Sequence, residues 1–396
     1  MTTTVDTGQL AFPATEYAER ISRVQYSAEK RALDALVITD PKNICYLTGY
    51  DAYSYYVPQA LVVPVGATPE FLVLRQIDVP AARWTTHLAT DQIVGYGDEY
   101  VTGTLHPMGL VAELVGASGW GRGRIGVEFD GSSFSPKGMH ALEQGLPNAK
   151  LVDLDRLVEW VRTVKSDREI QTMREAALLS DHAMRTAFQR IAPGVRESEV
   201  AADTHAAMVS GVDGIYGTAP FPLFLASGER TNNPHLRWTD ATFRAGQPTM
   251  IELGGHRFNY AAGLSRTVFL GEPPPAYRAF EQAVREGLAA ASEVLIAGNT
   301  AARVEQVWRE VIAAHGYAKN SRIGYSIGIS FPDTGWVERT VSLAPDDHSV
   351  LRPNMTIHLM LAVWLDLIGY SLSETFVVRD GAPEGLSALP RELLVK

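Results

Sequence analysis

Residues 250–271 read MIELGGHRFNYAAGLSRTVFLG, and this stretch decides how the chain is interpreted. Two apolar runs flank a polar segment, a pattern that predicts two strands joined by a turn. The first run contains one acid, Glu252, and a second acid that could complete a metal-binding pair is missing: Gly263 stands eleven residues further on. Because burying an unpaired charge in a strand is costly, the lone carboxylate indicates a functional position.

Length and composition limit the classes of protein to consider. A chain of 396 residues with 46% apolar residues can bury two cores, so two domains are expected. The net charge is −10 and no run of basic residues occurs, which disfavours nucleic-acid binding. Cys45 is the single cysteine, which suits a reducing cytosol. With no signal-peptide pattern and no run of eighteen apolar residues, we expect a cytoplasmic protein that does not enter membranes.

Hydrophobic periodicity predicts a mixed α/β (α+β) chain with a boundary near residue 160, giving domains 1–160 and 161–396. In the first domain a helix is expected at 18–33, among short strands at 34–40, 60–66, 70–76, 92–97 and 124–130. In the second, Ser166 and Glu169 form a capping box that begins a long helix ending at Pro193-Gly194. Further helices are expected at 197–211, 277–298 and 300–316, and strands at 249–253, 265–270, 355–365 and 374–379.

Polar residues inside apolar strands are the candidates for chemistry. Glu252 and Glu374 both interrupt such runs and could form an acid–base pair, although each could instead pair with an arginine. His235, on a polar loop, suits a general acid or base, or has no special role. His358 is surrounded by apolar residues, which favours a satisfied core histidine.

Arginines and tyrosines are the candidates for binding a substrate. Arg266 and Arg339 could each hold a substrate carboxylate or pair with one of the glutamates. Tyr50 and Tyr53 belong to a tyrosine-rich segment, 49–61, that fits either an aromatic ligand pocket or an interface. No HExxH, GxSxG, CxxC or phosphate-loop motif occurs, so these classes of hydrolase and nucleotide-binding protein are disfavoured.

Several segments together resemble the creatinase/aminopeptidase P/methionine aminopeptidase (M24, "pita-bread") family. They are MIELGGHRFNYAAGLSRTVFLG, ALVITDPKNICYLTGYDAYSYY, VKSDREIQTMREAA and NNPHLRW, the last resembling the loop that bears a substrate-facing histidine. The resemblance implies a creatinase-type N-terminal domain, a pita-bread catalytic domain and a homodimer. It also makes Tyr325, in GYSIGIS, a further candidate for substrate binding.

Metallopeptidases of this family bind two metal ions through two Asp, one His and two Glu. On this chain the resemblance puts these ligands at Glu252, Gly263, Ser326, Met360 and Glu374. Glycine, serine and methionine are poor ligands for hard divalent cations, so we expect neither a metal nor another cofactor.

The metal-free branch of the family contains creatinases and ectoine hydrolases, and SRIGYSIGISFPDTGWVERTVSL resembles the latter more closely. The resemblance implies that a small cyclic amidine is hydrolysed at a C–N bond. Glu252 would be the nucleophile or base, Glu374 and His235 would move protons, and Arg266 or Arg339 would hold the substrate carboxylate. The alternatives are creatinase-type hydrolysis of a guanidino compound, a metal-dependent Xaa-Pro dipeptidase, and a non-catalytic binding protein.

Overall fold

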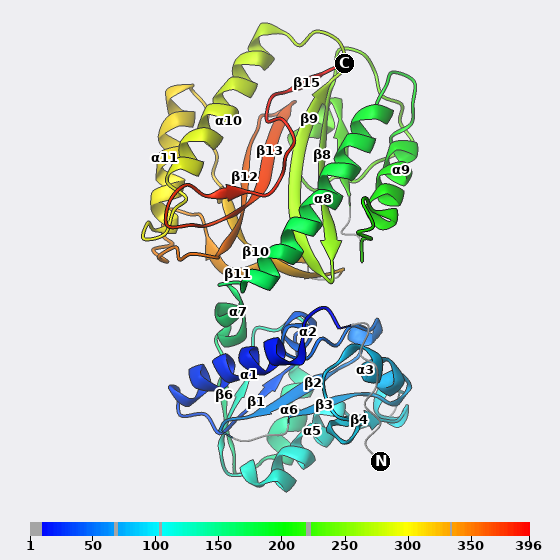
Figure 1. The fold of residues 1–396 in the computed structure, drawn as a ribbon, viewed down its shortest axis with the longest axis vertical. Coiled ribbons are helices and arrows are strands. Elements are labelled where there is room, and N and C mark those ends of the chain that lie inside the picture. The colour runs from blue at the N-terminus through cyan, green and yellow to red at the C-terminus, as the bar shows by residue number, and fades with distance from the viewer. Residues whose placement is uncertain (1–9, 67–69, 103–104, 219–222, 333–334) are drawn as a thin grey trace. The chain divides into compact units, whose positions relative to one another are not determined.

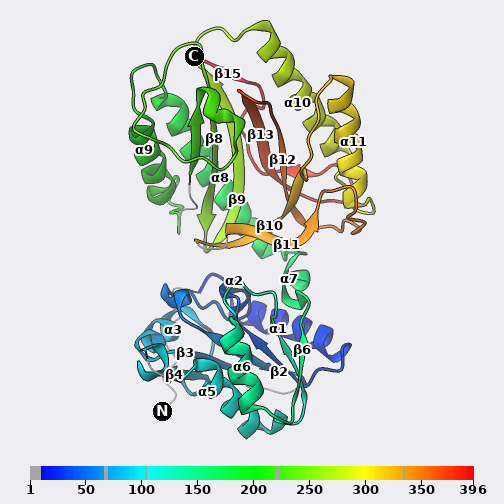
Figure 2. The same cartoon turned by 180° about the vertical axis from the view of Figure 1, so that it is seen from behind.

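The computed structural model describes residues 10–66, 70–102, 105–218, 223–332 and 335–396. The chain divides into two compact units between Arg162 and Thr163 (Figures 1 and 2). Within the described residues, no helix combines the length and the apolarity that crossing a membrane requires.

The N-terminal unit is built on a six-stranded mixed sheet with the order β4-β3-β2-β1-β5-β6. Its central strands β1 and β2 are buried along their whole length, as expected for apolar runs covered on both faces. The helix expected at 18–33 lies earlier, because it begins after Pro13 and ends at Glu29. The strands are β1 (Ala35–Ile38), β2 (Ala60–Pro64), β3 (Phe71–Arg75), β4 (Ile93–Tyr96), β5 (Arg124–Val127) and β6 (Lys150–Asp153), and the helices are α1 (Ala14–Glu29), α2 (Pro41–Thr48), α3 (Val79–Thr85), α4 (Glu99–Thr102), α5 (Pro107–Val115), α6 (Pro136–Gly145) and α7 (Leu157–Arg162).

The C-terminal unit has a long sheet with the order β11-β10-β12-β13-β9-β8-β7, and an added pairing of β10 with β9 curves it. Its strands are β7 (Phe224–Ser227), β8 (Pro248–Arg257), β9 (Tyr260–Phe269), β10 (Gly324–Phe331), β11 (Gly335–Ser342), β12 (Thr356–Trp364) and β13 (Gly369–Val377), with the short β14 (Glu384–Gly385) and β15 (Leu394–Val395) at its margins. The stretch 250–271 forms most of the hairpin β8–β9, as predicted.

Two helix pairs cover one face of this sheet. The first pair, α8 (Asp167–Arg190) and α9 (Glu197–Ser210), shares an apolar cluster with β7, β8 and β9. The second pair, α10 (Pro275–Glu293) and α11 (Ala301–Ala314), shares another cluster mainly with β12 and β13 (Figure 1). The capping box at the start of α8 is confirmed, because Ser166 and Glu169 bond to each other's backbone N–H. Residues that alternate onto the other face of the sheet are therefore free to form a site.

Candidate active site

Strand register puts one row of residues on the sheet face away from the helices. Glu252 on β8 is opposite Ser265 on β9, Ser265 is opposite Ser373 on β13, and Ser373 is opposite Met360 on β12. Directly opposed residues share a face, so Glu252 and Met360 lie on the same side of the sheet.

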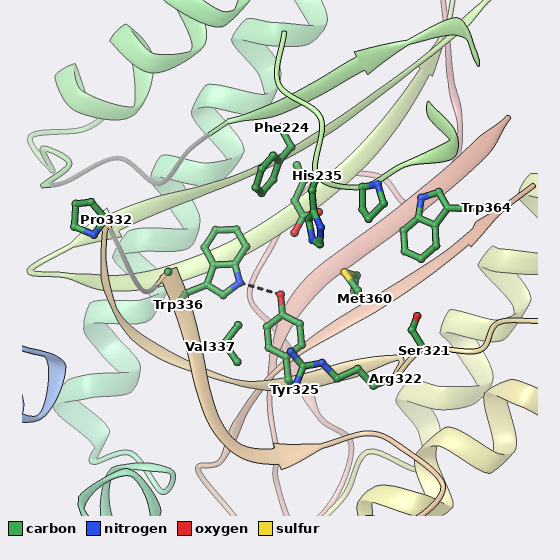
Figure 3. A pocket seen from close by; sticks show the side chains of 13 residues that line it. Phe224, His235, Ser321, Arg322, Tyr325, Pro332, Trp336, Val337, Met360 and Trp364 are labelled. Atoms are coloured by element: carbon green, nitrogen blue, oxygen red, sulfur yellow. Dashed lines mark hydrogen bonds between the residues drawn. The ribbon is translucent and has the colours of Figure 1, made fainter. Parts of the chain in front are cut away.

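Glu252 is one of the residues that line a cavity of about 590 Å³ in the C-terminal unit. Figure 3 shows this cavity with the aromatic and basic side chains around it. A volume of this order suits a small-molecule site. The cavity is lined by Phe224, Pro234, His235, Glu252, Ser321, Arg322, Tyr325, Pro332, Gly335, Trp336, Val337, Met360 and Trp364.

The carboxylate of Glu252 is buried, and the structure gives it no hydrogen bond from a described residue. The Nε2 atom of His358 lies 3.9 Å from the Oε1 atom of Glu252, which is too long for a direct hydrogen bond. Burial raises the pKa of Glu252 to about 7, while the positive charge of Lys319 acts in the opposite direction. A carboxyl group that titrates near neutrality suits a general base or a nucleophile.

Aromatic rings form the walls of the cavity. The Trp336 Nε1–H donates a hydrogen bond of 3.0 Å to the Tyr325 hydroxyl (Figure 3). Phe224, at the start of β7, packs against the imidazole of His235, with ring centroids 5.6 Å apart. Tyr325 and His235 thus both border the cavity, where the sequence had predicted functional roles for them.

Two cations at the site were missed by the sequence reasoning. Arg322 lines the cavity, with its guanidinium 4.4 Å from the centre of the Tyr325 ring and a 3.3 Å hydrogen bond to the Ser342 hydroxyl. Lys319 is buried behind the cavity and donates to the carbonyl of Met360 at 3.0 Å. Burial lowers the pKa of Lys319 to about 7, although Glu252 counteracts this. The only sequence signal for Lys319 and Arg322 was their position in a loop just before an apolar strand. Such loop residues are usually exposed to solvent, so this signal did not indicate a role in the site.

The prediction that Glu374 lines the site with Glu252 is wrong. Glu374 is opposite Leu264 and Leu359, so it lies on the helix-covered face. There it is fully buried and accepts from Arg266 at 3.0 Å and from Arg391 at 2.7 Å. Two guanidinium groups neutralise its charge, which leaves it no free oxygen for catalysis.

Arg266 is correspondingly not a substrate-binding residue. Besides Glu374, its guanidinium donates to the backbone carbonyls of Ser265, Ser373, Leu389 and Pro390. All of these partners belong to the sheet or to the C-terminal segment, so no donor of Arg266 is left for a substrate. Of the two alternatives from the sequence, the structure shows the ion pair with a glutamate, Glu374.

The remaining predicted substrate-binding residues are not among those that line this cavity. Arg339 is on β11 with a left-handed φ of 58°, and it is not part of the cavity wall. Tyr50 and Tyr53 belong to the N-terminal unit, where Tyr50 is buried and Tyr53 is 78% exposed. Their role in binding stays a prediction.

The side chains around Glu252 do not suit a pair of metal ions. A Cβ atom on Gly263 would come within 2.3 Å of His358 Nδ1, so the imidazole occupies the space of the expected second acid. Burial lowers the pKa of His358 to about 3, which keeps this ring neutral. Among the described residues, no group of three or more His, Cys, Asp or Glu side chains could hold a metal ion.

Two expected ligand positions also need correction. Ser326 has its side chain on the helix-covered face, opposite Ile357, and its hydroxyl bonds to Thr340 at 2.7 Å. Its neighbour Tyr325 is the residue that faces the site. On β13 the site-facing residue is Ser373, because Glu374 points the other way. Met360 does line the cavity, and its thioether remains a poor ligand for a hard cation.

Comparison with known proteins gives matches over almost the whole chain. Residues 20–164 match the Creatinase/Prolidase N-terminal domain, and residues 171–380 match metallopeptidase family M24. The chain is 38% identical to the uncharacterized hydrolase/peptidase y4tM of Sinorhizobium fredii, over 98% of this chain and 99% of that protein. It is 34% identical to ectoine hydrolase of Halomonas elongata, again over 98% and 99%.

Solved structures show the same fold. The crystal structure of dipeptidase PepE from Mycobacterium ulcerans superposes with a TM-score of 0.82 at 22% identity, covering 97% of this chain and 99% of that one. An X-Pro aminopeptidase from Thermotoga maritima superposes with a TM-score of 0.81, also at 22% identity. The predicted fold, a creatinase-type N-terminal domain followed by a pita-bread domain, is thereby confirmed, and this chain belongs to family M24.

Proposed function

We propose that this chain is a metal-independent hydrolase that opens a small cyclic amidine at a C–N bond, with ectoine or a close relative as its substrate. Membership in family M24 makes it a hydrolase of that family, and the relative from Halomonas elongata supports the class of bond. The observation that carries the proposal is Glu252, a buried carboxylate without a hydrogen-bond partner among the described residues, facing an aromatic-walled cavity.

The cavity complements a ring that carries both a cation and a carboxylate. A delocalised amidinium is attracted to a carboxylate and to the faces of aromatic rings, and Glu252, Trp336 and Tyr325 supply both. A substrate carboxylate would pair with Arg322, whose guanidinium is already oriented by Tyr325 and Ser342. In this proposal Arg322 takes the role that the sequence had suggested for Arg266 or Arg339.

The reaction needs one nucleophile and one proton donor. In one route Glu252 takes a proton from a water molecule whose oxygen bonds to the amidine carbon. In the other route a Glu252 oxygen bonds to that carbon itself, and a water molecule later hydrolyses the bond and restores the carboxylate. In both routes the electron pair of the C=N bond moves to nitrogen. His235 then protonates the ring nitrogen that leaves, the C–N bond breaks, and the product is an N-acylated diamino acid. A positioned acid or base contributes roughly 10²- to 10⁴-fold.

The experiment is a substrate panel on the purified full chain. We expect turnover of ectoine or 5-hydroxyectoine that survives treatment with EDTA, and no turnover with Glu252→Gln. Creatine turnover alone would instead show a creatinase-type enzyme, and EDTA-sensitive cleavage of an Xaa-Pro dipeptide would show a metallopeptidase. No turnover of any of these compounds would refute the proposal and favour a binding protein.

A further inference from the structure

His358 is the buried polar group that the proposed reaction leaves unexplained. It lies on β12, fully buried, and the sequence favoured a satisfied core histidine there. The structure supports this prediction at most for Nδ1: burial lowers the pKa of the ring and an interaction with the Gly263 backbone raises it, while neither ring nitrogen has a partner at full hydrogen-bonding geometry among the described residues. Because leaving a buried polar atom without a hydrogen bond is destabilising, the presence of Nε2 beside Glu252 requires a reason.

The packing around His358 fixes the direction of its free nitrogen. The imidazole lies nearly parallel to the Tyr325 ring, at 5.4 Å and 19°, and to the Trp336 ring, at 5.6 Å and 30°. Its Nδ1 edge lies against the backbone of Gly263, where any Cβ atom would collide with it. Nε2 is therefore the atom that faces the Glu252 carboxylate, 3.9 Å away.

The separation of these two atoms suits one water molecule. At 3.9 Å they do not bond directly, but one water can lie within about 2.8–3.0 Å of both. A buried water of this kind satisfies polar atoms that have no other partner. Glu252 is an acceptor when ionised, and the neutral imidazole of His358 can accept through Nε2 when Nδ1 carries its proton.

We infer that Glu252 and His358 hold the hydrolytic water between them, and that His358 orients it towards the amidine carbon. This rests on the proposed function. In the step, the water oxygen bonds to the amidine carbon as Glu252 takes one of its protons, and His358 Nε2 accepts a hydrogen bond from the other. The C=N electron pair moves to nitrogen, which takes the proton that Glu252 received. The hydroxyl on the carbon then gives its remaining proton to Glu252 as the C=O bond forms, the leaving ring nitrogen is protonated by way of His235, and the ring C–N bond breaks. Amidine and water become amide and amine.

The other charged and titratable groups around Glu252 come from several strands and loops. Lys319 lies on the loop before β10 and Arg322 follows it, Tyr325 lies on β10, and His235 is on the loop after β7. None of them has Nε2 of His358 as a hydrogen-bond partner. The imidazole is therefore available to the water.

The first test is a high-resolution crystal structure of the wild-type chain. We expect an ordered water within hydrogen-bonding distance of both Glu252 and His358. A site without such a water, or with a metal ion in its place, would overturn the inference even if the enzyme is active. A water in this place in a protein that hydrolyses no amidine would overturn the proposed function and leave the water site standing.

The second test is kinetic. His358→Leu should lower kcat roughly 100-fold with little change in KM, since the substrate contacts remain. His358→Gln, whose amide can accept near the position of Nε2, should recover part of that loss. The matched control is His256→Leu on β8, which removes another buried, neutral imidazole four residues beyond Glu252, outside the cavity lining, and should leave kcat unchanged. Wild-type kcat in a folded His358→Leu protein would refute the role.

A variant that leaves His358 itself intact covers the case in which its replacements do not fold. Gly263→Ala puts a methyl group 2.3 Å from Nδ1, so the ring must shift. We expect a loss of kcat comparable to that of His358→Leu. If kcat is unchanged while a crystal structure shows the ring displaced, the position of His358 does not matter and the inference fails.

Discussion

Glu252→Gln should stabilise the protein while it abolishes turnover, and the stabilisation should depend on pH. Burial raises the pKa of Glu252 from its ordinary 4.5 to about 7. Between these two values the folded state keeps a proton that the unfolded state loses. The contribution of this proton to the free energy of unfolding is therefore fully present below pH 4.5 and is lost as the pH rises from 4.5 through 7. Above that range it does not change further with pH. Glutamine is uncharged throughout and escapes this loss.

The size of the effect follows from the two pKa values. The difference between about 7 and 4.5 corresponds to roughly 3 kcal/mol, since one pH unit is worth about 1.4 kcal/mol. The gain in stability is at most this large, because replacing Glu252 also removes the attraction between its carboxylate and the Lys319 ammonium group. For a unit of this size each kcal/mol moves the melting temperature by about 2–4 °C. The variant should thus gain several degrees over the wild type at pH 8 and little at pH 5.

The assay is thermal unfolding of both proteins at pH 5 and pH 8 at one salt concentration. Glu229→Gln, at an exposed carboxylate of the same unit, serves as the control and should show no such pH dependence. An equal difference in melting temperature at both pH values would refute the reasoning, because it would mean that Glu252 does not titrate between them.

Three further predictions concern the charges around the site. Glu374→Gln should destabilise the protein by about 3–5 kcal/mol in thermal unfolding, because it weakens the neutralisation of the buried Arg266; unchanged stability would contradict a structural role. Arg322→Met should lower kcat/KM roughly 10- to 100-fold for a carboxylated amidine and far less for an analogue without the carboxylate; equal losses would rule out that contact. The wild-type kcat/KM should rise with pH through about 7, as Glu252 loses its proton. Lys319→Met should move this rise to higher pH, because the positive charge of Lys319 lowers the pKa of Glu252. An unchanged pH profile in the variant would show that the two charges do not interact.

The sequence identified the strand β8 and its acid because both signals are local. Alternation of apolar residues and one interrupting carboxylate are visible within ten residues, and the structure gives Glu252 the cavity wall that this pattern suggested. The capping box at Ser166 was readable for the same reason, since its two bonds span three residues. The missing acid at Gly263 was equally visible.

The face of each strand residue was harder to determine. Glu374 and Ser373 are adjacent in sequence, and only the register with β9 and β12 shows that Ser373 faces the site while Glu374 faces the helices. A one-residue error in the register of a strand exchanges its two faces. The same error put an expected metal ligand at Ser326, whereas its neighbour Tyr325 is the residue that faces the site.

By itself, the sequence determined that the chain has two αβ units, that a lone acid stands in the hairpin of residues 250–271, and that the second acid of a metal-binding pair is missing there. Only the tertiary structure decided which side chains meet that acid. His358, Lys319 and Arg322 come from strands and loops more than sixty residues away, and the curvature of the sheet brings them to Glu252. Such long-range proximity leaves no periodicity in the sequence, because it depends on how separate strands pair and curve, and local propensity does not encode that.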